Sequence, residues 1–388
     1  MDIFLLRHSI FTPTVFLSMF AFSVLASSAS AAEGESESGS KLEPELQSKP
    51  QSRLSVFSEF DIVATSEAVP INDMANGWDG DYRRGELVFA DANWSTGFSV
   101  NSNVFGQNLG KVSIAREQRS YYYMSFDKET SDFYRALELD ETLTGSKKLD
   151  LEVKQFDALG MRVGYQAPKY TFKEIDVSAG VSFTYYNVGH FQFGRIQGIA
   201  EAGDVEAASA VIDYRYDNDK ILDHQADVDD GTGISFSANM KLTYLNWQAA
   251  LAMNDIFNRF QWDNGAFTTG CVNIGGGSNA QCQTAGAGSG ISGQKTVVES
   301  IPATINSRLT HLGADVTLHL MRHDEFYRLG LEKGYQTSLG RFALFLYHPR
   351  LVGGSWQTKY FNFQLGADTL KLSRTRNIQL NMGVNWHW

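Results

Sequence analysis

The chain has 388 residues and a formal net charge of −11 at pH 7, and this acidic balance argues against nucleic acid as a partner. Hydrophobic residues make up 43% of the sequence and charged residues 20%. No stretch beyond the N-terminus approaches the roughly 18 consecutive apolar residues of a membrane-spanning helix. The composition therefore excludes a nucleic-acid-binding protein and a protein that crosses a membrane with helices.

The N-terminus predicts an export signal. Residues 15–26, "VFLSMFAFSVLA", form an apolar run that follows Arg7 and precedes the small residues "ASA" at 29–31. This length is typical of a signal-peptide core, whereas a spanning helix needs about 20 apolar residues. We predict a signal peptide over 1–32, followed by a disordered acidic periplasmic leader over 33–53, which is polar and holds two prolines.

From residue 54 onward the dominant hydrophobic period is two. In the segment 86–100, Val88, Ala90, Ala92 and Trp94 alternate with polar residues. The segments 149–165, 175–185, 234–244 and 378–388 alternate in the same way. Alternation indicates strands with one apolar and one polar face. These segments are longer than the 5 or 6 residues of most soluble strands, and about 10 residues cross a bilayer as a tilted strand.

An exposed apolar sheet would aggregate, whereas a closed barrel has no edge and can turn its apolar face to lipid. We therefore predict an all-β fold over 54–388, a transmembrane antiparallel up-and-down β-barrel of about 12 strands (10–14) with long extracellular loops and short periplasmic turns. The expected strands are 54–66, 84–101, 110–124, 148–167, 174–197, 232–245, 247–262, 304–320, 325–336, 341–348, 356–368 and 376–388.

Two connections and one further segment complete this prediction. Residues 321–325 and 348–355 are expected among the periplasmic turns. Residues 210–220 also alternate, and they either extend a strand or add a hairpin that brings the count to about fourteen.

The export signal, the alternating strands and the C-terminal strand ending in an aromatic residue resemble the outer-membrane β-barrel proteins of Gram-negative bacteria. The resemblance implies a place in the bacterial outer membrane, in contact with its lipid and lipopolysaccharide. It also implies that the barrel-assembly machinery recognises the last strand. Trp386 and Trp388 are expected to serve as aromatic girdle and assembly signal, with Trp388 where many such proteins carry Phe.

Charged and histidine side chains on the inward face are the candidate lumen lining. They are Glu59, Asp61, Asp91, Glu152, Lys154, Arg162, His190, Lys241, Asp315, His319, Arg328 and Glu332, and His311 is expected inward with them. Opposed charges of this kind line channels, but they also pair and fill narrow lumens. About twelve strands lie between eight, which pack shut, and sixteen, which leave an aqueous pore.

We expect a narrow outer-membrane channel or uptake pore for small polar solutes. The alternative is a non-conducting barrel that acts as scaffold or partner of a periplasmic or surface assembly, with 33–53 as its docking arm. A membrane-embedded hydrolase is a remote third reading, because Ser307 and His311 share a strand face but stand about 13 Å apart. We therefore expect no enzyme activity and no cofactor.

The remaining features lie in loops. Cys271 and Cys282, within "CVNIGGGSNAQC", predict a disulfide that closes a small extracellular loop, because two thiols alone do not make a zinc site. The acidic stretch 213–230 does not match a calcium-binding EF-hand loop, and we expect a solvated loop and no metal. The basic stretch "KLSRTR", with Lys371, Arg374 and Arg376, either meets lipopolysaccharide phosphates or forms a solvated turn.

Overall fold

A computed structural model describes residues 54–387 except 77, 79, 105–106, 204–207, 220–223, 226–227 and 275–287. The predicted signal peptide (1–32) and leader (33–53) lie outside the described residues.

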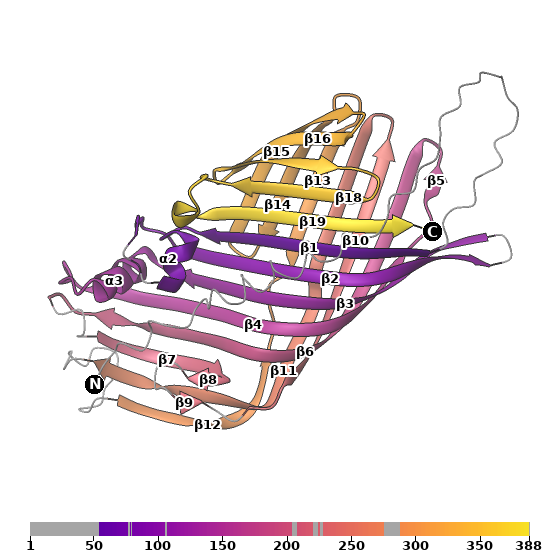
Figure 1. The fold of residues 1–388 in the computed structure, drawn as a ribbon. Coiled ribbons are helices and arrows are strands. Elements are labelled where there is room, and N and C mark those ends of the chain that lie inside the picture. Colours follow the sequence, from indigo (N-terminus) through magenta and orange to yellow (C-terminus); the bar gives the residue numbers. More distant parts are fainter. Residues whose placement is uncertain are drawn as a thin grey trace, which may run out of the picture.

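Fourteen antiparallel strands form one closed barrel (Figure 1). In order around the wall they are β1 (Leu54–Ser66), β2 (Leu87–Val104), β3 (Gln107–Phe126), β4 (Lys147–Gln166), β6 (Ile175–Ala200), β10 (Gly231–Tyr244), β11 (Trp247–Ile274), β13 (Thr304–His311), β14 (Val316–His323), β15 (Phe326–Thr337), β16 (Gly340–His348), β17 (Leu351–Gln357), β18 (Phe361–Ala367) and β19 (Asn377–His387). The last strand pairs with the first from Ser55 opposite His387 to Thr65 opposite Asn377. The wall therefore has no free edge.

Further elements lie in the connections or extend the wall. β7 (Ala208–Tyr216) pairs with β6 and β11 and continues the column of β10, and β12 (Gly288–Glu299) pairs with β11 and continues the column of β13. The short strands are β5 (Tyr170–Phe172), β8 (Asn218–Asp219) and β9 (His224–Gln225), and the helices are α2 (Ile71–Asn76), α3 (Lys128–Glu138) and the 3₁₀ turn η2 (Leu372–Arg374). Each described helix is too short or too polar to cross a membrane.

The strand count lies at the upper end of the predicted range, and one missed turn and one missed strand explain the difference. Residues 304–320, expected as one strand, contain β13 and the start of β14, joined by a turn in which Asp315 has a φ of 47°. Residues 348–355, expected as a turn, lie largely in β17. The alternating residues 210–220 are not the source of the extra strands, because β7 lies beyond the fourteen-strand ring.

The missed turn after β13 also reverses the expected side of two connections. Strand direction alternates around the wall. One uncounted strand therefore exchanges the extracellular and periplasmic sides of every later connection, until a second uncounted strand restores them. Residues 324–325 and 349–350 join their strands at the end that carries the long loops. The prediction that 321–325 and 348–355 are periplasmic turns is therefore wrong.

The asymmetry of the two ends is as predicted. The connections 67–86, 127–146, 201–230 and 275–303 are long, whereas 245–246, 312–315, 338–339 and 358–360 are short. In Figure 1, α2 and α3 lie at the end with the long connections and the C-terminal end of β19 lies at the other. These ends are extracellular and periplasmic, respectively.

The outer face of the barrel is apolar and bordered by aromatic residues. On β15, the exposed Leu329 and Leu331 lie between Tyr327 and Tyr335 on the same face. Trp386 on β19 is 48% exposed, and Trp388 lies outside the described residues. An apolar band between two aromatic girdles is the exterior of a transmembrane barrel. The structure thus confirms the fold class and the outer-membrane location.

The extracellular connections fold back onto part of this outer face. Trp78 of the first long connection and Tyr134 of α3 have ring centroids 4.7 Å apart and belong to a cluster that includes Tyr122 of β3. Val153 of β4 packs against this cluster. It faces outward as predicted, but protein covers it in part.

A charge on the lipid face should destabilise the barrel far more than one in the lumen. We expect Leu331→Arg to lower the free energy of unfolding by about 2 to 4 kcal/mol, because an arginine near the midplane enters hydrocarbon. Asn306→Arg is the matched control, since Asn306 lines a polar cavity. Denaturant titration of both variants from lipid vesicles measures the difference, and a larger loss for Asn306→Arg would reverse the assignment of faces.

The lumen as candidate functional site

Inward-facing aromatic side chains fill the extracellular part of the lumen. This set, called here the aromatic layer, comprises Phe89, Tyr121, Tyr123, Phe156, Tyr186, Phe191, Phe193, Phe260, Trp262 and Phe326. Each of these side chains is at most 4% exposed. On β3, β6 and β11 the layer is two successive inward positions deep, a separation of about 7 Å along each strand.

Ring contacts within the layer connect different sides of the wall. The ring centroids of Phe156 on β4 and Phe260 on β11 are 4.4 Å apart, although β6 and β10 separate the two strands in the wall. Phe89 on β2 stacks on His323 of β14 at 4.5 Å, and the Tyr121 hydroxyl lies 2.8 Å from His323 Nε2. These contacts cross the lumen and close it at this level.

A buried ion triad lies directly beneath the layer, on its periplasmic side. Arg119 donates to Asp91 through Nε at 3.0 Å and Nη2 at 2.8 Å, and to Asp255 through Nη1 at 3.0 Å and Nη2 at 2.9 Å. Arg119 and Asp255 are only 5% and 2% exposed. Burial makes each charge dependent on its partners, because an unpaired charge in a low-dielectric interior is strongly unfavourable.

Asp255 reaches the lumen because β11 is irregular at this point. The pairing of β10 with β11 shifts register between Phe236 and Ala238, and Asp255 has a φ of 57°. As a result Asn254 and Asp255 both line the lumen, whereas consecutive residues of a regular strand face opposite sides. The Ser235 hydroxyl donates to the Asp255 carboxylate at 2.7 Å.

Two more charge networks lie nearer the periplasm. Arg162 on β4 is 3.4 Å from Glu117 on β3, whose carboxylate also accepts a hydrogen bond from the Tyr186 hydroxyl. Arg341 on β16 is 2.8 Å from Glu332 on β15. Charges of opposite sign thus pair along the wall.

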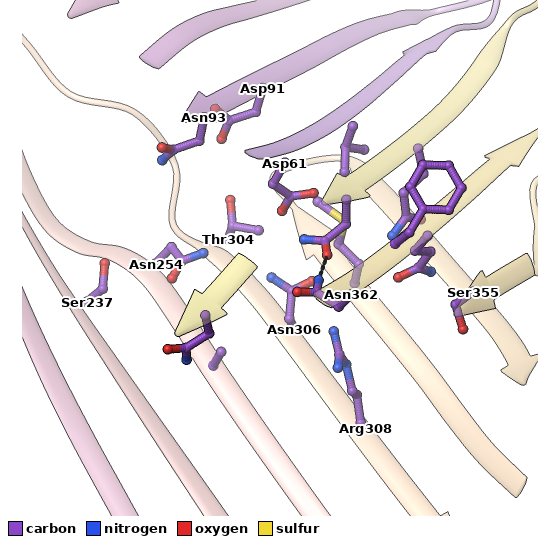
Figure 2. Close-up of a pocket in the computed structure, with 18 of the residues that line it drawn as sticks. Asp61, Asp91, Asn93, Ser237, Asn254, Thr304, Asn306, Arg308, Ser355 and Asn362 are labelled. Atoms are coloured by element: carbon purple, nitrogen blue, oxygen red, sulfur yellow. Dashed lines mark hydrogen bonds between the residues drawn. The ribbon is translucent and has the colours of Figure 1, made fainter. Parts of the chain in front are cut away.

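Between these networks lies a cavity of about 600 Å³ (Figure 2). Its lining is mostly hydroxyl, amide and charged side chains, among them Asp61, Asp91, Asn93, Ser237, Asn254, Thr304, Asn306, Arg308, Ser355 and Asn362. The β17–β18 turn at 358–360 also borders the cavity, and this turn lies at the periplasmic end. The cavity is therefore a polar vestibule on the periplasmic side of the aromatic layer.

The structure places most of the predicted lining residues on the inner face. Glu59, Asp61, Asp91, Glu152, Lys154, Arg162, Lys241, His319, Arg328 and Glu332 all lie at inward positions. Asp315 lies in the β13–β14 turn and reaches the same network through Arg341, 2.7 Å away. His190 lies beside a register shift in the β4–β6 pairing, and its Nδ1 is 2.8 Å from Asp217 in an extracellular connection.

The inward assignment of His311 is wrong. Its ring lies 4.8 Å from that of Trp247, which is 49% exposed on the outer face. Ser307 lies on the same outer face beside Leu309 and Leu318. The two residues weighed as a hydrolase pair therefore face lipid.

Several lumen residues were absent from the predicted lining: Glu117, Arg119, Asp255, Arg308 and Arg341. The two-residue alternation could have identified Glu117 and Arg119, because the odd residues of β3 face inward. It could not have found Asp255, since the irregular backbone breaks the alternation. Treating 304–320 as one strand with inward odd residues leaves Arg308 out of the lining, whereas the turn at 312–315 switches the inward positions from even on β13 to odd on β14.

The predicted loop features have mixed outcomes. Lys371 and Arg374 are exposed at the extracellular end, and their contact with lipopolysaccharide stays a prediction. Arg376 is buried there, where its Nη1 donates to the Glu67 carbonyl at 2.6 Å and links the last strand to the first.

Cys271 lies in β11, whereas Cys282 lies outside the described residues, so the disulfide also stays a prediction. In the acidic stretch, Asp213 lies 2.7 Å from Arg215. Part of the stretch 213–230 lies outside the described residues.

Comparison with known proteins gives structural likeness only. No family model and no curated protein matches the sequence. The toluene transporter TodX of P. putida is similar with a TM-score of 0.37 and 10% identity over 88% of this chain and 91% of that one. A FadL homologue of Pseudomonas aeruginosa has a TM-score of 0.35 and 10% identity over 87% and 90%. The monoaromatic hydrocarbon channel CymD has a TM-score of 0.29 and 11% identity over the same shares.

Removing the central cation of the buried triad should destabilise the barrel, and removing all three charges should not. We expect Arg119→Met to lower the free energy of unfolding by about 3 to 5 kcal/mol, because it leaves the buried Asp255 and the half-buried Asp91 without a counter-charge. The triple variant with Asp91→Asn, Arg119→Met and Asp255→Asn should recover most of that loss. Denaturant titration of the reconstituted proteins compares them, and equal losses in both variants would refute an electrostatic role for the triad.

Proposed function

We propose that this protein is an outer-membrane uptake channel for small polar solutes and that the structure represents its closed state. In this proposal the aromatic layer is the gate and the polar vestibule is the compartment that a solute enters on its way to the periplasm. The observation that carries the proposal is the polar cavity of about 600 Å³ beneath a layer of buried aromatic rings.

The chemistry of the vestibule supports a polar rather than an apolar solute. Asn93, Asn254, Asn306 and Asn362 offer both donors and acceptors to the cavity. Ion pairs on opposite sides of the lumen add charges of both signs, an arrangement that orients small polar molecules in a pore. An apolar solute would leave these groups unsatisfied and would gain little there.

The construction of the gate supports opening by side-chain rearrangement. The aromatic rings of the closure belong to the wall itself, and among the described residues of the connections Val228 and Ile301 pack with them. Ring rotations at positions such as Phe156 and Phe260 would therefore open a passage without unpairing any strand. Fourteen strands enclose a wider lumen than the roughly eight strands whose interior side chains alone can fill.

A non-conducting barrel is the second candidate, and the aromatic layer is the observation that favours it. Its rings are fully packed, and His323 on β14 contacts Tyr121 on β3 across the lumen. The other ring nitrogen of His323 lies 2.8 Å from the Thr304 hydroxyl on the neighbouring strand β13. A permanent core of this kind would suit a scaffold. The two candidate functions predict different conductance after aromatic side chains of the layer are truncated.

Conductance in planar bilayers separates them. We expect the wild-type protein to show brief, infrequent openings, and Phe156→Ala with Phe260→Ala to increase the open time at least about tenfold, since truncating both rings lowers the barrier to passage. Phe342→Ala, on the lipid face, is the matched control and should behave as wild type.

Each outcome favours one candidate. A wild-type protein that stays silent and a double variant that also stays silent, both folded by heat-modifiable gel migration, would refute the channel. A conducting double variant beside a permanently silent wild type would identify the aromatic layer as a core rather than a gate.

A further inference from the structure

The arginines of the lumen fall into two groups that differ in their partners. Arg119, Arg162 and Arg341 each lie within 4.0 Å of carboxylates on neighbouring strands. Arg308 and Arg328 do not: among the described residues, no carboxylate oxygen lies within 4.0 Å of either guanidinium. The second group therefore carries positive charge that the described wall does not neutralise by direct contact.

Arg328 is the stronger anomaly of the two. It is 3% exposed, and its only hydrogen bond to described protein atoms runs from Nη1 to the Gln379 side-chain oxygen at 2.9 Å. Its Nε and Nη2 are buried and have no partner among the described protein atoms. Buried guanidinium groups ordinarily satisfy their donors, because an unpaired buried charge is costly.

Arg328 lies beside the vestibule, behind the residues that line it. The residue stands on β15 and its partner Gln379 on β19, with β16, β17 and β18 between them in the wall. The side chain therefore extends across the lumen rather than along the wall. Gln379 lines the cavity, and so does Met321, the cross-strand neighbour of Arg328.

Arg308 lies two strands away from Arg328, with β14 between β13 and β15. It lines the cavity from β13 and is exposed to it (Figure 2). Asp61 on β1, also a lining residue, lies within electrostatic reach of both arginines and is the acid that offsets them in part. The His319–Glu332 pair between the two strands adds a histidine and a carboxylate at 3.3 Å, with Glu332 also held by Arg341.

We propose that Arg328 and Arg308 form an anion-binding subsite of the vestibule, which takes the carboxylate or phosphate group of a small polar solute. Two guanidinium groups and one carboxylate, Asp61, leave a net charge of +1 at the subsite. Arg308 meets the oxyanion at the cavity wall. A displacement of the lining side chain Met321 or Gln379 then lets the oxyanion reach the two free donors of Arg328 in the fork geometry that guanidinium groups prefer. Asp61 limits affinity, so that a bound solute can leave toward the periplasm. This subsite rests on the proposed channel function and names the solutes it would take.

Binding to the detergent-solubilised full chain tests the subsite without requiring conduction. The probes are succinate, its neutral diamide succinamide, and inorganic phosphate, measured by isothermal titration calorimetry at low salt. We expect succinate to bind at least about tenfold more tightly than succinamide, the difference typical of a lost charged contact. Comparison with phosphate distinguishes a carboxylate site from a general oxyanion site, and either result supports an anion subsite.

Three variants and a control give the test its direction. Arg328→Met and Arg308→Gln should each weaken succinate binding by about tenfold. Asp61→Asn should tighten it, because the competing negative charge is gone. Lys333→Gln removes a cation from the outer face of β15, outside the lumen, and should leave affinity unchanged. Arg328→Met should also fold at least as well as wild type, since an apolar side chain replaces an unpaired buried charge.

The subsite is overturned if succinamide binds as tightly as succinate, if no anion binds, or if Asp61→Asn weakens binding while the protein remains folded. Its failure is distinguishable from that of the channel. If the protein binds succinate but never conducts, the subsite stands and the uptake function is refuted. If the protein conducts but binds no anion, the channel stands and the subsite is refuted.

Discussion

Backbone hydrogen bonding in hydrocarbon is the constraint on which the rest of this structure depends. A strand within a bilayer finds no water for its N–H and C=O groups, so every strand needs two neighbours. The pairing of β1 with β19 meets this requirement over eleven residue pairs, from Ser55 to Thr65. The Arg376 side chain reinforces the same seam at the extracellular end by donating to the Glu67 carbonyl. Closure in turn fixes which face of every strand meets lipid.

Closure also creates an interior that the chain has to fill or hydrate. Near the extracellular side, large aromatic rings from opposite parts of the wall meet and exclude water. Near the periplasm, amide, hydroxyl and paired charged groups line a cavity. The Asp91–Arg119–Asp255 triad lies at the boundary, where three charges can be buried because each has a partner. Arg308 and Arg328, which have no carboxylate oxygen within 4.0 Å among the described residues, lie on the polar side of this boundary, and we propose that they bind a ligand there.

The sequence predicts the barrel well because a period of two is a direct consequence of strand geometry. The long, regular strands β2, β4, β10 and β19 have the faces that alternation indicates, and so does β6 as far as Val188. The sequence did not predict the turn at 312–315 or the strand β17. The strands concerned, β13, β14 and β17, have only 7 or 8 residues and provide few alternations. Asp255 escaped notice for a different reason: its left-handed backbone is a local irregularity that hydrophobic period does not encode.

The state of the lumen was beyond the reach of the sequence. Alternation places Phe156 and Phe260 inward, but nothing along the chain indicates that two residues a hundred positions apart touch at 4.4 Å. The number of strands is compatible with both an open channel and a filled barrel, so it could not decide between them. Only the arrangement in space reveals a lumen that is packed with aromatic rings on one side and has a polar cavity on the other.

The most direct test of this account is the side from which the vestibule can be reached. Asn306→Cys, inside the vestibule, should react with a bulky membrane-impermeant maleimide only after the outer membrane is permeabilised. Glu141→Cys, on an exposed extracellular connection, should react in intact cells and serves as the reference. Labelling of Asn306→Cys in permeabilised cells alone is the result that the account predicts. Labelling in intact cells at the rate of Glu141→Cys would contradict a lumen closed on its extracellular side.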